Sequence, residues 1–378
     1  MNPTAFALIE TAAALDGIAP EWDALYAASR RRHACLAFPW VRATFLRQAQ
    51  RRGRRPAVVV GRRDGCIVLL WPLVVFRSRL WRVCRGLSED MADFDDMLCR
   101  HGPEAEALCR GAWAHAVAAL RPHMMMFRRV PAGAGLDRAI PPAASNWQRP
   151  SASPCALLGG ADGRRAARPD VRLRADLRRK RRLLEQAGPV RFGEVAEGSA
   201  RDAAIAWAFA RKHERLGAAA HSRREKTEHA AFGNLVPFYV EQAQADARAG
   251  GMRVLRLAAG EATVAVSTVR ADGRRAVGWL YGYDETFARA SPGLLAVAET
   301  LAWARSAGFR IFDMMPEPEP YKRKWAACGY RVRDVRVATG WWGRPLLAWH
   351  RSSLRGMALA VYMRAPRPVQ AAVRRLFR

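Results

Sequence analysis

The order of the elements that the sequence predicts occurs twice along the chain, and this repetition constrains the fold most. In each half, helices precede an antiparallel meander of strands, and a helix and one more strand follow it. The meanders turn at Asp64-Gly65 and at Asp272-Gly273, pairs that supply the positive φ of a hairpin turn. Since 378 residues suffice for two or three domains, the repeated order favours an internal duplication of one α/β unit.

The composition of the chain sets the domain boundaries that we expect. The stretch Pro131–Pro154 is rich in Pro, Ala, Gly and Ser, which is typical of a linker or of a loop excursion. We therefore expect an N-terminal domain over residues 1–150, a second domain over 151–343 and a basic helical tail over 344–378. Tyr330–Ala338 is predicted to be the last strand of the second sheet.

Hydrophobic patterning and cysteine use indicate a cytoplasmic protein. Half of the residues are hydrophobic, which excludes a disordered chain. The seven cysteines are odd in number and form no CxxC pair, so we expect neither a disulfide framework nor a cysteine-bound zinc site. Met1–Ala14 lacks the basic region of a signal peptide. The apolar run Cys66–Phe76 is too short to span a bilayer and predicts a buried strand.

The formal net charge of +29 leaves two interpretations open. Lys and Arg together number 63, but only five are lysines, a skew typical of a sequence that uses arginine as its default surface cation. The charge then describes a solvated basic surface, or it binds phosphate-bearing ligands or an anionic membrane. The tail over 344–378 is compatible with a helix peripheral to the inner membrane or with one packed across the domain interface.

The segment Gly278–Tyr330 holds the clearest candidate binding site. A strand ends at Tyr283-Asp284, and a helix begins at Ser291-Pro292-Gly293. Serine suits an N-cap, proline the first turn, and glycine lets a ligand approach the backbone. The free N–H groups and positive dipole end of such a helix suit a pyrophosphate, although an ordinary capped helix has the same pattern.

Four motifs of this half resemble a known family. They are Tyr281-x-Gly-Tyr283-Asp284, Ser291-Pro292-Gly293-Leu294-Leu295, Phe312-Asp313 and Tyr321-Lys322-x-x-Trp325, with a weaker match in the basic segment Leu173–Gly188. The chain resembles the CelD-like (BioF2-like) acetyltransferase domain of the GNAT superfamily, associated with bacterial cellulose and exopolysaccharide synthesis, and more distantly the Fem-type aminoacyltransferases. The resemblance implies an α/β (α+β GNAT-like) fold. It implies two tandem acyl-CoA N-acyltransferase-like domains with mixed, largely antiparallel sheets, the N-terminal one degenerate.

The same resemblance implies the donor and its binding residues. Acetyl-CoA or another acyl-CoA is expected, with its pyrophosphate near Arg289, Ser291, Gly293 and Leu294. Lys322 would meet the donor's phosphate or polarise the reacting carbonyl. The segment from Arg289 to Gly293 departs from the usual Q/R-x-x-G-x-G/A loop, as it does in Fem-type relatives that use aminoacyl-tRNA. An aminoacyl-tRNA donor is therefore the alternative.

Acyl transfer to an amine needs a neutral amine, and a general base assists it. The candidate bases are Asp284 and Asp313, at strand ends, with Glu319 and His229, and carboxylates at such positions are also common as loop caps. Tyr281 is expected to protonate a thiolate leaving group, or to be a half-buried strand aromatic.

We predict N- or O-acyl transfer to an amine or hydroxyl of a sugar or polysaccharide precursor. The alternatives are Fem-like aminoacyl transfer and a non-catalytic scaffold at a polysaccharide synthase. The basic segment 172–182, with seven cations in eleven residues, suits CoA phosphates or nucleic acid, but no aromatic residues interleave to stack on bases. The acidic cluster Glu89–Asp96, with Asp93 and Asp95, would receive a cationic acceptor or a metal ion, or form a solvated loop.

Overall fold

A computed structural model describes residues 3–29, 33–78, 80–88, 94–141, 146–159, 171–220, 229–230 and 232–352. Its chain forms two compact units, the first made of Met1–Ser151 with Arg331–Arg378 and the second of Ala152–Tyr330. Among the described residues no helix is long and apolar enough to cross a lipid bilayer.

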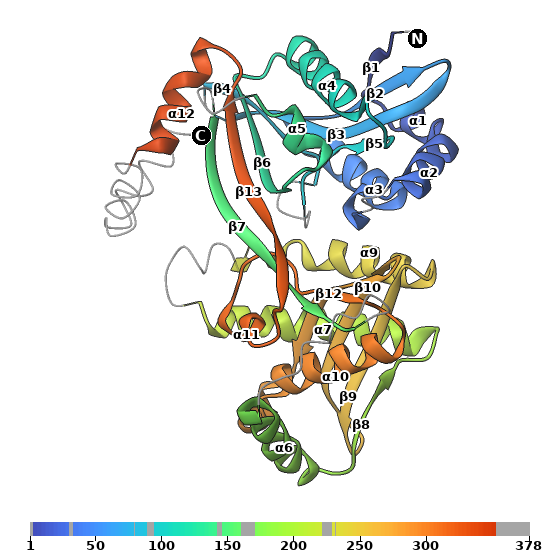
Figure 1. Cartoon of the computed structure of the whole chain (residues 1–378), viewed down its shortest axis with the longest axis vertical. Coiled ribbons are helices and arrows are strands. Elements are labelled where there is room, and N and C mark those ends of the chain that lie inside the picture. The colour runs from blue at the N-terminus through green and yellow to red at the C-terminus, as the bar shows by residue number, and fades with distance from the viewer. Residues whose placement is uncertain are drawn as a thin grey trace. The chain divides into compact units, whose positions relative to one another are not determined.

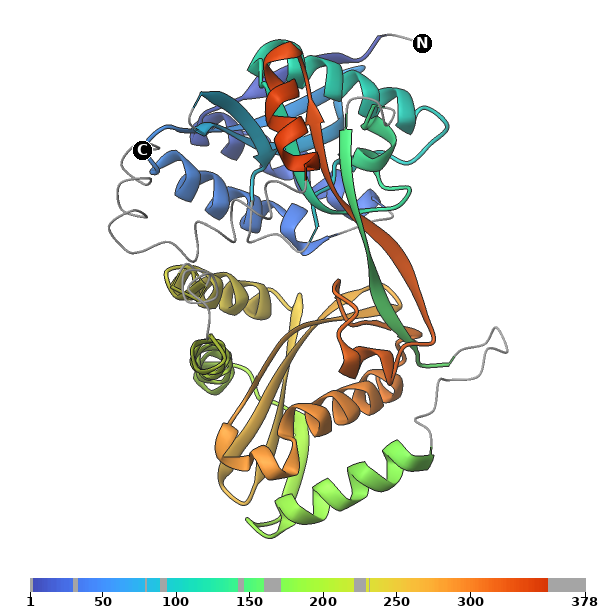
Figure 2. The same cartoon turned by 90° about the vertical axis from the view of Figure 1, so that its left-hand side faces the viewer.

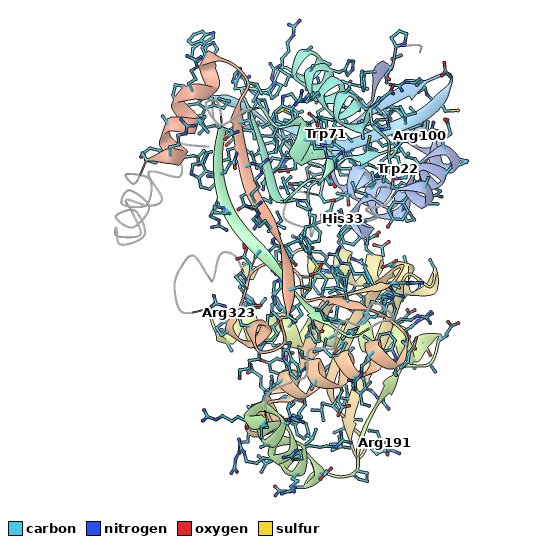
Figure 3. All side chains as sticks on the ribbon, in the orientation of Figure 1. Trp22, His33, Trp71, Arg100, Arg191 and Arg323 are labelled. Atoms are coloured by element: carbon cyan, nitrogen blue, oxygen red, sulfur yellow. The ribbon has the colours of Figure 1, made fainter. Side chains whose placement is uncertain are left out.

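The first unit is a mixed sheet with helices on both faces (Figure 1). Its elements are β1 (Ala5–Ile9), α1 (Ala12–Asp16), α2 (Ala19–Ala28), α3 (Phe38–Ala49), β2 (Arg54–Arg63), β3 (Cys66–Ser78), β4 (Trp81–Gly86), β5 (Leu98–Cys99), α4 (Ala105–Leu120), β6 (Met124–Pro131), α5 (Gly135–Ala139), β13 (Cys328–Ala338), η5 (Trp341–Gly343) and α12 (Arg344–Arg351). The sheet order is β1-β2-β3-β4-β6-β13, and β4 runs parallel to β6. One core contains Trp71 and α4, and the other contains Trp22 and α3 (Figure 3).

The second unit repeats this arrangement. Its elements are β7 (Asn146–Leu157), α6 (Val171–Glu185), β8 (Val190–Glu194), α7 (Ser199–Ala218), α9 (Val236–Arg248), β9 (Met252–Ala259), β10 (Ala262–Asp272), β11 (Arg275–Tyr283), η4 (Glu285–Ala290), α10 (Pro292–Ser306), β12 (Ile311–Asp313) and α11 (Pro320–Arg323). The sheet order is β8-β9-β10-β11-β12-β7, and β11 runs parallel to β12. Helices α6 and α10 cover one face of the sheet, and α7 and α9 cover the other (Figure 2).

The two units have the same strand order and the same single parallel pair, so the expected duplication is confirmed at the level of topology. The last strand of each sheet comes from the other half of the sequence. The end of β7, Cys155–Leu157, pairs with β12, and Val332–Ala338 of β13 pairs with β6. The exchange makes each unit depend on both halves of the chain.

Two expectations of the sequence are wrong in this region. Pro131–Pro154 is not a linker throughout, because β7 begins at Asn146 inside it. The strand predicted at Tyr330–Ala338 exists, but most of it belongs to the first sheet, where Val335 and Val337 lie opposite β6 and are buried. Of the predicted basic tail, the structure describes α12 and one further residue, and residues 353–378 lie outside the described part.

A bulge in β11 determines which way its second half faces. Thr268 of β10 pairs with Leu280, and Val269 pairs with Gly278, so Trp279 is an extra residue. A β-bulge of this kind reverses the side-chain alternation beyond it. Gly282 therefore faces α7, where the Cβ of any other residue would collide with the backbone of Ala208.

Replacing Gly282 by alanine should destabilise the protein by about 1–3 kcal/mol, because α7 must move away from β11 to admit a methyl group. Urea denaturation measures the free energy of unfolding. Gly193→Ala is the matched control, since Gly193 also lies in a strand but has open space at its Cβ position. Equal stabilities of the two variants would contradict the tight contact between α7 and β11.

Candidate active site

The parallel strands of the second unit separate after three residues. Arg275–Val277 pair with Ile311–Asp313, and β11 then continues to Tyr283. In the part of the chain that the structure describes, no strand pairs with this side of β11 beyond Val277. The free edge offers backbone N–H and C=O groups to an extended ligand, as strand edges do in peptide recognition.

Tyr281 lies on this free segment, and the bulge turns its side chain toward the α10 face. Its hydroxyl lies over Gly278, where an added Cβ would come within 2.8 Å of both this oxygen and the ring of Phe312. The hydroxyl is buried and has no hydrogen-bond partner among the described residues. Burial raises the pKa of Tyr281. The phenol therefore keeps its proton and is available as a hydrogen-bond donor.

Tyr321 and Trp325 pack in the same core cluster as Tyr281. Burial raises the pKa of Tyr321, and the neighbouring Glu319 carboxylate raises it further. The indole Nε1 of Trp325 is buried and without a hydrogen-bond partner among the described residues. Trp325 also lines a groove of about 310 Å³ beside α10, with Leu295 among its apolar walls. Buried polar atoms without partners are rare, so they mark places where a ligand can supply the missing bond.

Lys322, the expected phosphate-binding cation, has other partners. Its Nζ donates to the carbonyl oxygens of Met315, Pro316 and Glu317 at 3.2, 3.1 and 3.1 Å. It also lies 3.1 Å from the carboxylate of Glu319. The side chain is buried, and Met315 and Glu317 have positive φ angles of 65° and 75°. Lys322 thus holds the loop after β12 in an unusual conformation. Its role toward a donor stays a prediction.

The cation at the start of α10 is Lys180 of α6. Its Nζ donates to the Oγ of Ser291 and lies 3.7 Å from a carboxylate oxygen of Asp176. Ser291 adopts the left-handed conformation, φ 48°, and its side chain does not cap α10 as the sequence suggested. This backbone geometry directs the hydroxyl toward α6 instead. The sequence analysis offered the whole basic segment 172–182 for CoA phosphates or nucleic acid but did not single out Lys180, although the scarcity of lysine was a signal that could have found it.

The other residues expected around the donor lie nearby in sequence but differ in role. Gly293 lets the ring of Tyr283 approach, because an added Cβ would lie 3.0 Å from it. Leu294 packs against the core of this unit. Arg289 is exposed at the end of η4. Asp284 caps η4, accepting hydrogen bonds from the N–H and hydroxyl of Thr286 at 2.8 and 2.7 Å.

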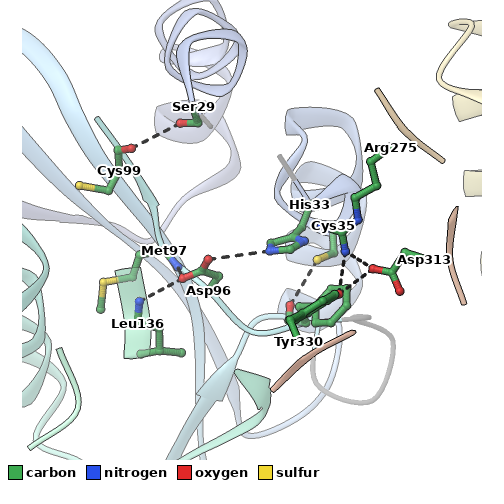
Figure 4. Close-up of polar contacts among 11 residues, drawn as sticks. Ser29, His33, Cys35, Asp96, Met97, Cys99, Leu136, Arg275, Asp313 and Tyr330 are labelled. Carbon is green, nitrogen blue, oxygen red and sulfur yellow. Dashed lines mark hydrogen bonds and ion pairs between the residues drawn. The ribbon is translucent and has the colours of Figure 1, made fainter. Parts of the chain in front are cut away.

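Asp313 is the most enclosed carboxylate of this region, with 0 % of its surface exposed. It accepts hydrogen bonds from the hydroxyls of Ser153 and Tyr330, both at 2.7 Å, and from the N–H of Met315 at 2.8 Å. Arg275 forms an ion pair with it (Figure 4). These contacts engage both carboxylate oxygens, so the geometry supports a positioning role for Asp313 rather than proton transfer.

His229, another candidate base, lies against α7. Its ring stacks on that of His213 with centroids 4.2 Å apart, and its Nε2 is 3.1 Å from the backbone oxygen of His213. The structure therefore gives His229 a packing partner and a hydrogen bond of its own.

The described end of the acidic cluster in the first unit is buried. Asp95 lies directly against Gly86, and its Oδ2 accepts the N–H of Arg128 at 2.7 Å. Asp96 accepts the N–H groups of Met97 and Leu136, and its other oxygen lies 3.9 Å from His33 (Figure 4). These two residues are not part of a solvated loop. Residues 89–93, including Asp93, lie outside the described part, and the described residues contain no group that could hold a metal ion.

Burial raises the pKa of Asp95 from 3.8 to about 7, against the lowering effect of the Arg128 N–H and nearby arginines. Between these values the folded protein holds a proton that the unfolded chain has released, so the free energy of unfolding should fall as pH rises from about 4 to about 7. Asp95→Asn should remove this part of the pH dependence. Urea denaturation across this range measures it, and parallel curves for the two proteins would contradict the assignment.

Comparison with known families supports the fold. Residues 171–323 match the family described as acetyltransferase (GNAT) domain. No curated protein sequence matches the chain. Most of the second unit is thus similar to a GNAT domain, and the protein has a mixed α/β fold of the GNAT type in two tandem units.

Solved structures with similar folds cover most of the chain at low identity. The C-terminal domain of a putative lysylphosphatidylglycerol synthetase from Agrobacterium fabrum is 11 % identical, with a TM-score of 0.52, 89 % of this chain and 95 % of that chain covered. A protein of unknown function from Bacteroides thetaiotaomicron is 12 % identical, with a TM-score of 0.49 and coverages of 85 and 97 %. FemX is 9 % identical, with a TM-score of 0.46 and coverages of 90 and 99 %.

Proposed function

We propose that the second unit is an acyltransferase that moves an acyl group from an acyl-CoA thioester to an amine or hydroxyl. The observation that carries this proposal is the buried, unpartnered hydroxyl of Tyr281 beside the free edge of β11. An extended pantetheine arm can pair with that edge, and its thioester sulfur would then meet a protonated phenol. The match of residues 171–323 to an acetyltransferase domain supports the same chemistry.

The donor's phosphates are assigned to the start of α10. Lys180 supplies a cation there, and the first turn of α10 supplies its positive dipole end. An incoming phosphate would replace the Ser291 hydroxyl as the partner of Lys180. Further arginines on α6 add positive charge along the same helix.

The proposed reaction uses Tyr281 on the free edge of β11 and a carboxylate next to α11. The neutral nucleophile attacks the thioester carbon, and the carbonyl oxygen takes up the negative charge of the tetrahedral intermediate. When the carbon–sulfur bond breaks, the thiolate takes the proton of Tyr281, and the base takes the proton of the nucleophile. We assign the base to Glu319, because it contacts Lys322, adjoins Tyr321 and stays half-exposed to an acceptor. Glu319 then releases its proton to solvent, and Tyr281 recovers one from solvent.

The acceptor is proposed to be a sugar or another polysaccharide precursor, on the sequence resemblance to CelD-like domains alone. One observation favours the alternative donor, an aminoacyl-tRNA. The start of α10, where a glycine-rich phosphate loop would be expected for acyl-CoA, instead has Ser291 and a Gly293 that is covered by the ring of Tyr283. Binding of CoA and of tRNA by the same protein distinguishes the two donors, since tRNA binding should weaken steeply with salt.

Lys180→Gln should raise the dissociation constant for CoA about tenfold, because one charge-assisted contact to phosphate is lost. Isothermal titration calorimetry measures this constant. Arg179→Gln is the matched control, since Arg179 neighbours Lys180 on α6 but points to solvent and pairs with Asp176. Equal effects of the two variants would reject the role of Lys180, and no binding of CoA to the folded wild type would reject the acyl-CoA donor.

Tyr281→Phe should lower kcat about 10²–10⁴-fold and leave KM for the donor unchanged, because the ring still packs while the proton donor is gone. Thiol release in a colorimetric assay measures both constants. A thioester of a more acidic thiol should recover much of the lost rate, since its thiolate leaves without protonation. Tyr283→Phe, which removes a hydroxyl from the same strand, is the control and should lower kcat much less. An undiminished kcat in Tyr281→Phe would overturn the assignment.

A further inference from the structure

Large hydrophobic side chains of the described residues are exposed mainly at one place on the first unit. Five such side chains are more than one third exposed, and three of them lie there: Leu80 at 77 %, Trp341 at 67 % and Trp342 at 56 %; the other two are Val171 at 69 % and Trp349 at 44 %. We call Leu80, Trp341 and Trp342 the tryptophan patch. Trp349 lies on the following helix, α12. Clustered exposed hydrophobic residues mark interaction surfaces, whereas single ones are ordinary.

The backbone under the tryptophan patch is held firmly. The indole Nε1 of Trp81, the residue after Leu80, donates to the backbone oxygen of Trp342 at 2.8 Å. Thr339 is anchored through its N–H to the backbone oxygen of His123 at 3.2 Å. Gly343 lies so close to His123 that a Cβ there would collide with it. The turn is therefore fixed by contacts that do not involve the indole rings of Trp341 and Trp342.

The two indoles contact each other rather than the core. Their ring centroids are 4.1 Å apart, and both rings are more than half exposed. Two indole rings that stay in water forgo the favourable free energy that their burial would give. Tryptophan is also the side chain that is most characteristic of the interface between water and lipid, where its ring lies among the headgroups.

A basic groove adjoins the tryptophan patch. It has a volume of about 620 Å³ and is lined by Trp341 and by one stripe of α12 that includes Arg344, Leu347 and Arg351. Arg344 and Arg351 are seven residues apart and thus lie on the same face of the helix. The described lining of the groove contains no carboxylate, so its charge is positive. An anionic headgroup fits this chemistry.

From these observations we infer that this face of the first unit binds an anionic phospholipid membrane. The indoles of Trp341 and Trp342 insert among the headgroups, and Arg344 lies at the level of the lipid phosphates. The net charge of +29 adds long-range attraction to such a surface. A peripheral site of this kind needs no membrane-spanning helix. It is independent of the acyl transfer proposed for the second unit.

Co-sedimentation of the full chain with vesicles tests this inference. Binding to vesicles that contain phosphatidylglycerol should be strong, and binding to pure phosphatidylcholine weak. The double variant Trp341→Ser and Trp342→Ser should bind the anionic vesicles about tenfold more weakly, because two apolar rings no longer leave water. Brominated phosphatidylglycerol should quench the tryptophan fluorescence of the wild type and quench that of the double variant less.

Matched controls distinguish vesicle binding through the tryptophan patch from binding through net charge and from loss of the fold. Val171→Ser removes the fifth exposed hydrophobic side chain, which lies on α6 of the second unit, and should not change binding. Arg344→Gln should weaken binding about fivefold, and Arg191→Gln, on β8, should have little effect. Equal thermal unfolding temperatures show that the variants are folded.

Three outcomes would overturn the inference. The first is equal binding of the wild type and the double variant to anionic vesicles. The second is equal loss of binding in Arg344→Gln and Arg191→Gln, which would reduce the effect to net charge. The third is no vesicle binding together with a dimer in analytical ultracentrifugation that the double variant abolishes, since the patch would then join two copies of the chain.

Discussion

The hydrogen bonds of Asp313 stabilise the point in the second unit at which β11 and β12 separate. A carboxylate without solvent exposure is costly unless its oxygens are satisfied, and here a hydroxyl of β7, a guanidinium of β11 and a hydroxyl of β13 surround it. β7 comes from the first half of the sequence, so this one side chain ties the exchanged strand to β12. The separation of β11 from β12 begins directly after this cluster.

The bulge at Trp279 determines on which face of the sheet the side chain of Tyr281 lies. Without the extra residue, Tyr281 would share a face with Trp279, which packs against Phe209 of α7. With it, the Tyr281 hydroxyl lies on the α10 face in a dry environment. A short break in a regular strand thus places a protonated group beside a free strand edge, and the same burial that raises its pKa keeps it protonated.

Local elements of this fold could be predicted from the sequence, but contacts distant in sequence could not. The Asp-Gly turns, β3 and the start of α10 follow from turn chemistry and hydrophobic patterning, and their predicted positions agree with the structure within a few residues. The strand exchange escaped prediction because β7 carries two prolines and little alternation, and because β13 fits either sheet equally well. The contacts of Lys322 and Lys180 could not be predicted, since the ammonium of each is placed by a loop or helix whose packing no local pattern encodes.

The duplicated topology also shows why we assign the chemistry to one unit only. β4 and β11 occupy the same place in the two sheets, each parallel to the strand that follows the next long helix. After β11 the chain reaches Ser291, whose hydroxyl accepts a hydrogen bond from the ammonium of Lys180. In the first unit, Gly86 at the end of β4 is covered by the carboxyl group of Asp95. The side chain of Asp95 fills the space that a phosphate would need at that point. This difference supports our proposal of an anion site in the second unit and not at the corresponding end of β4 in the first.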